Sequence, residues 1–363
     1  MEPFDLDAAV RAGVLRSDQA DALRRFDEGR HGAPSATNER FGFITGFADI
    51  MAAIGLLMMA ATSMMVLSQS PLLVLAFPPL WWWAGTYFTA GRRLMFASLV
   101  IFVGFALSTA MGALGVMLAA GEMSPFTASY NDIPSFGVVV ISGIVSAACW
   151  IYWRRFQLPV SFAGFAVALA NFVICCIRAL IPHMPDWGVD LLVGLNGPAL
   201  FATAMWWDMS DVRRETIRSD VAFWLHLAAG FLVVKTGMAL ILGTRQSHAG
   251  WDRMFYQVAE PGGASAVGVV LLFLAFGTIA LAIDRRSLLT SGMVYLVPAI
   301  ALLAGGFAYS RLAPAIFIAG GFLTLLAIQW TSWRAALLKR LPEKLVAQLP
   351  RTQIKAVGPR PVY

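Results

Sequence analysis

Five polar side chains within apolar runs are the residues of this sequence whose types and positions could do chemistry. Asp49 and His226 lie near the beginnings of two runs, and Asn171, Asn196 and Lys235 lie deeper within such runs. An ionisable side chain at the centre of a bilayer costs about 2.5–3.5 kcal/mol on insertion scales, so its retention calls for a reason. We therefore interpret these five residues as candidate substrate-binding residues.

Helix geometry predicts that Asp49 and His226 share one layer. Counted along the helix, Asp49 lies about 12 Å and His226 about 8 Å from the same membrane boundary. The Asp49 carboxylate could then hold the imidazole of His226 in one tautomer. The alternative is that His226, about one turn inside a helix end, only touches lipid headgroups.

The other three residues predict a deeper layer. Lys235 lies about 21 Å from that boundary, and Asn171 and Asn196 fall at a similar height in the two preceding runs. The segment Asn196–Pro198 is expected to interrupt its helix, because proline lacks a backbone donor and leaves a carbonyl free. Interrupted helices near the midplane are typical of transporters. The alternative for Lys235 is that its ammonium group extends to the opposite membrane surface.

No enzyme motif accompanies these residues. The sequence contains no HExxH, Walker A, GxSxG or DxD motif, and we expect neither a catalytic residue nor a cofactor. Cys149, Cys175 and Cys176 lie within apolar runs without the spacing of a metal site, so we expect them to be buried and unpaired. The sequence therefore favours a protein that is not an enzyme.

Composition excludes a soluble domain. Hydrophobic residues make up 58% of the chain and charged residues 13%, about half the usual charged fraction of a soluble protein. The mean hydropathy is +0.70. The net charge of +6 does not indicate a nucleic-acid-binding protein, because the basic residues gather at the ends of apolar runs and not on one patch.

Four arginine pairs set the predicted topology. Each pair ends an apolar run, and the interval between pairs suits two membrane-crossing helices of about 20 residues each. Arginine clusters remain on the cytoplasmic side of a membrane, where anionic lipid headgroups are their natural partners. The pairs are Arg92 with Arg93, Arg154 with Arg155, Arg213 with Arg214, and Arg285 with Arg286.

The predicted fold is an all-α polytopic membrane helix bundle of about ten transmembrane helices. Alternation of the helices then places both termini in the cytoplasm and leaves Arg245, Arg253 and Arg311 in the opposite loops. The predicted spans lie near 41–66, 71–90, 94–120, 135–153, 158–181, 189–207, 221–243, 264–283, 288–308 and 312–332.

Two flanking segments complete the predicted organisation. Residues 1–40 are predicted to form a cytoplasmic helical hairpin followed by a linker, and this hairpin is a candidate site for a protein partner. Residues 41–333 form the predicted transmembrane domain. Residues 334–363 are predicted to form a cytoplasmic interfacial helix, with leucines among arginines and lysines, followed by a disordered tail.

Two short stretches resemble a known family. The segment Asp5–Arg30, with Ala12–Ala20 (AGVLRSDQA) at its centre, resembles the opening of a family of uncharacterised bacterial predicted membrane proteins. The stretch Arg218–His226 (RSDVAFWLH) is similar to a segment of some members. The family has no established activity, so the resemblance implies a multi-pass protein of the bacterial inner membrane and no particular chemistry.

Two functional hypotheses remain open on the sequence alone. One is a transporter or flippase of a small molecule or lipid, in which the buried polar residues form the site. The other is a non-catalytic membrane scaffold or assembly factor that recruits partners through its cytoplasmic ends. In that case the buried polar residues only join helices to one another.

Overall fold

The structure is a computed structural model, and it describes residues 16, 19, 47–92, 94–120, 135–181, 183–211, 216–242, 263–292, 295–296, 299–300 and 309–342. Its contacts divide the chain into two units, Met1–Phe41 with Arg351–Tyr363, and Gly42–Pro350. In the first unit, the Gln19 side chain accepts the backbone N–H of Arg16 at 3.2 Å. The rest of the predicted hairpin and linker, and the predicted tail after residue 342, lie outside the described residues.

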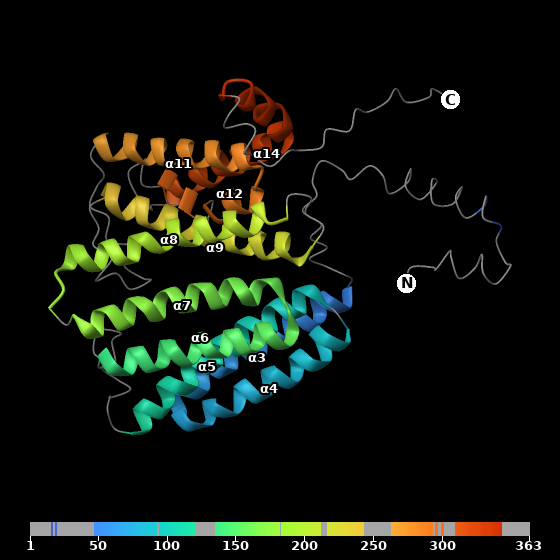
Figure 1. Ribbon diagram of the computed structural model, residues 1–363, viewed down its shortest axis with the longest axis vertical. Helices are drawn as coiled ribbons and strands as arrows, with labels where there is room; N and C mark the ends of the chain where they lie inside the picture. Colours follow the sequence, from blue (N-terminus) through green and yellow to red (C-terminus); the bar gives the residue numbers. More distant parts are fainter. Residues whose placement is uncertain are drawn as a thin grey trace. The chain divides into compact units, whose positions relative to one another are not determined.

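All regular elements described in the second unit are helical (Figure 1). The first group comprises α3 (Phe47–Gln69), η1 (Pro71–Ala76), α4 (Phe77–Ala84), η2 (Gly85–Gly91) and α5 (Met95–Ala119). The predicted span 71–90 is thus helical, but its geometry changes from 3₁₀ to α to π. Pro78 and Pro79 explain the first change, because proline fits the first turn of a helix and disrupts its interior.

The second group is the predicted run of long apolar helices. It comprises α6 (Ser135–Phe156), α7 (Pro159–Leu180), α8 (Asp186–Met209) and α9 (Ile217–Leu242). A tight turn at Gln157, with φ of 50°, joins α6 to α7, which pack against each other. Arg154 and Arg155 lie in the last turn of α6, where positive charge is favourable at a helix carboxyl end.

The third group comprises α11 (Gly263–Ile283), α12 (Arg286–Gly292) and α14 (Tyr309–Leu338). A sharp corner joins α11 to α12. Asp284 adopts the left-handed conformation there, with φ of 56°, and the Arg285 N–H donates to the Ala280 carbonyl at 3.1 Å. This pattern is a Schellman-type helix end, in which aspartate takes the place usually held by glycine. The corner therefore fixes the direction in which Arg285 leaves α11.

Helix α9 lies at the centre of the packing in the second unit. It packs most extensively against α8 and next against α12, and it also contacts α7 and α11. Leu225 and Ala229 of α9 belong to one buried core with α7 and α8, whereas Val234 and Met238 belong to another with α11, α12 and α14. A third buried core joins α3, α4, α5 and α6 around Trp81 and Tyr152. A residue on α9 can therefore connect two of the three cores.

Five of the described helices are long and apolar enough to cross a membrane. They are Met95–Met117, Phe136–Phe156, Pro159–Leu180, Asp186–Met209 and Ile217–Ile241. A sixth is reached if the two segments Ile316–Leu326 and Ile328–Leu338, bent by 65°, count as one span. Helix α14 continues past residue 333 to Leu338, so the predicted boundary between the last span and the interfacial helix is not a helix end.

Candidate functional site

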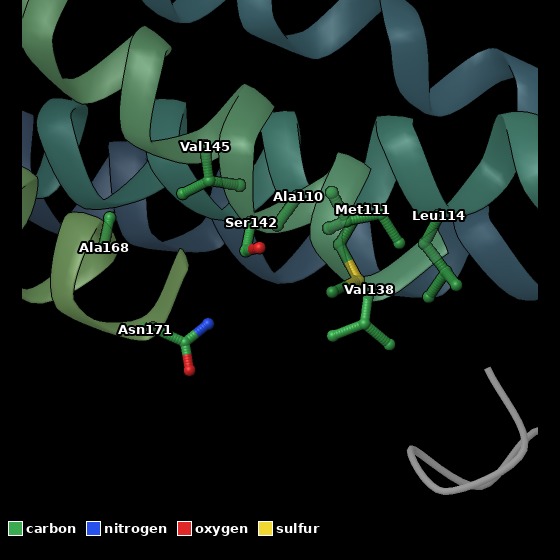
Figure 2. A pocket seen from close by; sticks show the side chains of 9 residues that line it. Ala110, Met111, Leu114, Val138, Ser142, Val145, Ala168 and Asn171 are labelled. Carbon is green, nitrogen blue, oxygen red and sulfur yellow. The ribbon is translucent and has the colours of Figure 1, made fainter. Parts of the chain in front are cut away.

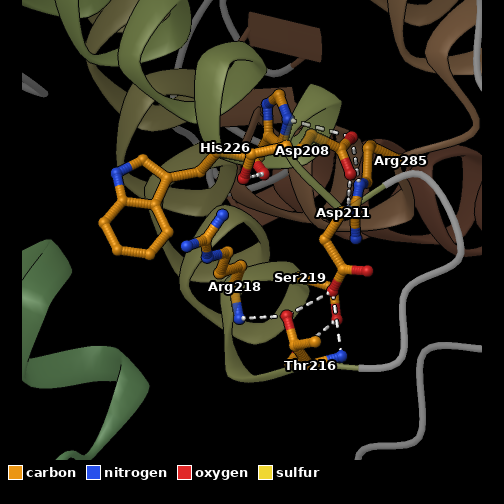
Figure 3. Close-up of polar contacts among 9 residues, drawn as sticks. Asp208, Asp211, Thr216, Arg218, Ser219, His226 and Arg285 are labelled. Carbon is orange, nitrogen blue, oxygen red and sulfur yellow. Dashed lines mark hydrogen bonds and ion pairs between the residues drawn. The ribbon is translucent and has the colours of Figure 1, made fainter.

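Three buried ionisable side chains meet where α8, α9 and α12 come together (Figure 3). Asp208 lies at the end of α8, His226 lies within α9, and Arg285 immediately precedes α12. The exposed fractions of these residues are 3%, 0% and 2%, respectively. We call these three residues the Asp208 cluster.

Arg285 holds the Asp208 carboxylate with two hydrogen bonds. Its Nε donates to Asp208 Oδ2 at 2.8 Å, and its terminal Nη2 donates to Oδ1. Paired, parallel hydrogen bonds of this kind orient a carboxylate as well as neutralise it. The same Oδ2 atom lies 3.8 Å from His226 Nε2. One carboxylate oxygen therefore faces both a guanidinium and an imidazole.

A second group of hydrogen bonds fixes the beginning of α9 beside the cluster. Asp211 Oδ2 accepts the backbone N–H of Thr216 at 2.9 Å and its hydroxyl at 2.7 Å. The Thr216 hydroxyl oxygen in turn accepts the Arg218 N–H at 3.3 Å, as an N-cap residue does. Ser219 donates its hydroxyl to the Thr216 carbonyl at 3.0 Å. These contacts set the start of the helix that carries His226.

The cluster corrects two expectations. One of the two interpretations of His226 paired it with Asp49, whereas the carboxylate beside His226 is that of Asp208. We also predicted that Arg285 contacts lipid headgroups together with Arg286. Instead, its guanidinium is buried against Asp208, because the α11–α12 corner turns Arg285 into the bundle. The sequence shows that His226 and Arg285 are ionisable residues near the ends of apolar runs, but it does not show that Asp208 is the partner of both.

Asp49 has a different role in the structure. Its Oδ1 accepts the Ala97 N–H at 2.9 Å and its Oδ2 accepts the Phe96 N–H at 3.3 Å, and the side chain is buried. Both amides belong to the first turn of α5, whose N–H groups have no partner within the helix. Asp49 of α3 thus caps α5, and its charge is favourable at the positive end of that helix.

We expect Asp49→Ala to destabilise the protein by about 1–3 kcal/mol, because one buried and one partly buried amide of α5 lose a charged acceptor. Asp49→Asn is the matched control, since it keeps one oxygen as acceptor and should cost less. Denaturant unfolding of the detergent-solubilised protein measures both changes. Equal stability of Asp49→Ala and the unchanged protein would contradict the capping role.

Asn171, the third residue of the predicted deeper layer, lies in a groove whose lining residues do not include Asn196 or Lys235. It lines a groove of about 290 Å³ formed by α5, α6 and α7, next to Ser142 and Ala168 (Figure 2). The Asn171 amide donates to Cys175 Sγ at 3.8 Å, one turn further along α7. The rest of the lining is apolar and comes from Ala110, Met111, Leu114, Val138, Ile141 and Val145.

Asn196 and Lys235 do lie at one level of the bundle. A Cβ atom added at Gly197 of α8 would lie 2.8 Å from the Val233 nitrogen of α9, and one added at Gly194 would lie 3.2 Å from Thr236 Cγ2. Asn196 lies between the two glycines on α8, and Lys235 lies between Val233 and Thr236 on α9, so the two residues occupy neighbouring turns. The predicted interruption of α8 is wrong, since the helix continues through Pro198. Proline is tolerated within membrane helices when neighbouring groups satisfy the freed carbonyl.

The other described arginines of the predicted pairs stack on aromatic rings. The distances from the guanidinium carbon to the ring centre are 5.4 Å for Arg92 over Tyr87, 5.8 Å for Arg154 over Trp150, 5.5 Å for Arg155 over Phe156 and 5.3 Å for Arg286 over Trp330. Such contacts place a cation over an aromatic face, and the Tyr and Trp rings among them are common at a membrane surface. Arg93, Arg213 and Arg214 lie outside the described residues.

The described ranges contain no group of three or more His, Cys, Asp or Glu side chains that could hold a metal ion. Comparison with protein-family models, curated proteins and solved structures found no match to this chain. The Asp208 cluster is therefore the site from which a function must be argued.

Proposed function

We propose that the chain is a multi-pass protein of the bacterial inner membrane, with about ten spans and both termini in the cytoplasm. The apolar helices support membrane insertion. Three contacts join helix ends that this topology places on the arginine-pair side: Asp49 with Ala97, Asp208 with Arg285, and Asp284 with Trp330. A reporter enzyme fused after Arg155 tests the topology, since activity on the far side of the membrane contradicts it.

Within this topology, the chain transports or flips a small molecule or lipid. The Asp208 cluster is the observation that supports this activity. Burying an ion pair is costly, and apolar residues of similar volume often give equal or greater stability. Ionisable residues within membrane helices commonly mark substrate pathways or proton relays, and His226 lies within the predicted span 221–243 while Asp208 and Arg285 lie just beyond the ends of their spans. Apolar residues could stabilise the junction of α8, α9 and α12 equally well. The three ionisable side chains there, one of them a histidine, therefore support a role beyond stability.

Anionic lipid headgroups are the proposed partners of the exposed paired arginines. Arg92, Arg154 and Arg155 are exposed, and each guanidinium stacks on an aromatic ring. Two of these rings belong to Tyr87 and Trp150, residue types that are enriched in the headgroup zone. Arg285 is removed from this set because it is buried. The guanidinium groups left on this side attract negatively charged lipids.

A scaffold or assembly factor is the second candidate, and two contacts favour it. Asp49 caps α5, and Asp284 Oδ1 accepts the Trp330 Nε1–H of α14 at 2.9 Å. Each of these carboxylates, Asp49 buried and Asp284 partly buried, joins one helix to another. In a scaffold, the Asp208 cluster would serve the same purpose.

The proposal is tested by an untargeted comparison of the metabolites and lipids of a strain that lacks the gene with those of its parent strain. Transport predicts that one compound or lipid class accumulates or is misplaced, and that the full-length gene restores it. Deletion of residues 1–38 is the complementary variant. If the phenotype depends on this segment and no metabolite or lipid changes, the scaffold replaces the transporter.

A further inference from the structure

The imidazole of His226 is the group in the Asp208 cluster whose ordinary pKa, about 6.5 for histidine, lies nearest to neutral pH. It is fully buried, with Asp208 Oδ2 at 3.8 Å from its Nε2. The imidazole also contacts the ring of Phe201, with the two ring centres 5.5 Å apart at an angle of 67°. The imidazole thus contacts an apolar ring and lies near a carboxylate.

The contacted oxygen atom links the charge of His226 to the Arg285 ion pair. Asp208 Oδ2 accepts the Arg285 Nε–H at 2.8 Å and is also the oxygen nearest His226. An imidazolium at His226 is attracted to this oxygen and repels the guanidinium that already occupies it. We propose that His226 and Asp208 form a proton-binding site, and that its protonation loosens the Arg285–Asp208 ion pair.

The chemistry of the step is simple. A proton from water adds to the lone pair of a ring nitrogen of His226, and the reverse step returns it, with no bond between heavy atoms formed or broken. The role of this proton as the coupling ion rests on the transport function proposed above. The proton-binding site itself does not depend on it.

The remaining charged groups near the site belong to the elements packed on α9. Asp211 follows α8 and is engaged by Thr216, while Asp220 and Arg218 lie in the first turns of α9. Asp284 of the α11–α12 corner is held by Trp330 and lies 3.7 Å from Arg334 of α14. On α7, Arg178 lies in the last turn, at the opposite end from Ala163, which packs against Leu225. Asp208 Oδ2 thus lies 3.8 Å from His226 Nε2, and Arg285, which holds this oxygen, also interacts electrostatically with Asp220.

Loosening of the ion pair acts directly on α12. Arg285 immediately precedes this helix, and α12 packs tightly on α9, where a Cβ at Gly230 would lie 2.6 Å from the Leu288 carbonyl oxygen. The helix is short and is tied at its beginning by Arg285. Its attachment to α9 should therefore weaken when the ion pair opens.

The first test measures the protonation of His226 directly. Full-length protein labelled with ¹⁵N-histidine is placed in lipid nanodiscs, and His31, His183 and His248 are replaced by glutamine so that one histidine signal remains. We expect this signal to change from neutral imidazole to imidazolium between about pH 8 and pH 5. A signal that stays in one form over this range would overturn the proposal.

The second test measures the consequence for α12. Hydrogen exchange of residues 284–292, corrected for intrinsic rates, should increase about tenfold from pH 8 to pH 5.5 in the unchanged protein. His226→Gln should abolish the increase, and His183→Gln, at an exposed histidine, should keep it. Exchange that ignores pH, or that rises equally in His226→Gln, overturns the proposal.

The two proposals fail separately. A metabolite or lipid phenotype without titration of His226 removes the proton site and leaves transport standing. Titration of His226 with the pH-dependent exchange, in the absence of any such phenotype, supports the proton site and removes transport.

Discussion

Replacing Arg285 with methionine should lower the free energy of unfolding by about 3–5 kcal/mol, because Asp208 is left as a buried charge without its counter-ion. Both Asp208 oxygens accept hydrogen bonds from this guanidinium, and neither side chain is accessible to water. Denaturant unfolding in detergent, together with the amount of protein inserted in the membrane, measures the effect. A stability equal to that of the unchanged protein would show that the ion pair is not formed.

The control is the combined variant Asp208→Leu with Arg285→Met. It replaces both charges by apolar side chains of similar size, which is often neutral or stabilising in a buried site. We expect its stability to return to within about 1 kcal/mol of the unchanged protein. A double variant as unstable as the single one would mean that the loss comes from packing and not from an unpaired charge.

Replacing Gly230 with alanine should also be strongly destabilising. The added Cβ would overlap Ser291 Oγ and lie 2.6 Å from the Leu288 carbonyl oxygen and 3.0 Å from Phe276 Cζ. The serine hydroxyl can rotate, but the carbonyl belongs to the α12 backbone, so α12 must move away from α9. Overpacking of this kind costs about 1–3 kcal/mol. Unfolding measurements in detergent should show this loss.

Gly55→Ala is the matched control for Gly230→Ala. Gly55 lies within α3, and a Cβ added there meets no atom within 4 Å. Alanine should stabilise the helix there by about 0.5–1 kcal/mol, since glycine loses more backbone freedom on folding. If both substitutions changed the free energy of unfolding by the same amount, helix propensity and not the close approach of α12 would determine the result.

The long apolar helices could be predicted from hydropathy alone, because a long apolar segment that crosses a membrane must form a helix. The predicted spans 94–120, 158–181 and 221–243 correspond to α5, α7 and α9, with ends that differ by a few residues. The segment 71–90 is helical, but it divides into three helical geometries and is not among the described helices long and apolar enough to cross a membrane. Hydropathy records how much of a segment is apolar and carries no information about helix type.

The continuity of α8 could not be predicted from local rules. Proline at 198 usually breaks a helix in water, yet α8 passes through it. Gly197 allows the α9 backbone to approach at Val233, so packing against α9 holds this stretch in place. Tertiary contact here overrides the local preference of the Asn196–Pro198 segment.

The candidate site could be predicted in part. His226 was identified because an ionisable residue in an apolar run is costly, and that argument needs only the sequence. Its partner was not identified, because helix rise gives the height of a residue and not its lateral neighbour. Asp49 and Asp208 both lie near helix ends, and the packing of α8 on α9 decides which of them meets His226.

The measurement that tests the account most directly is rescue of the deletion strain by the double variant Asp208→Leu with Arg285→Met. If the proposed transport function holds, this protein is inserted at the normal level but fails to restore the metabolite or lipid profile, because the charges then serve transport and are not needed for the fold. Full restoration by the uncharged pair would contradict the account, since it would show that the cluster only joins helices.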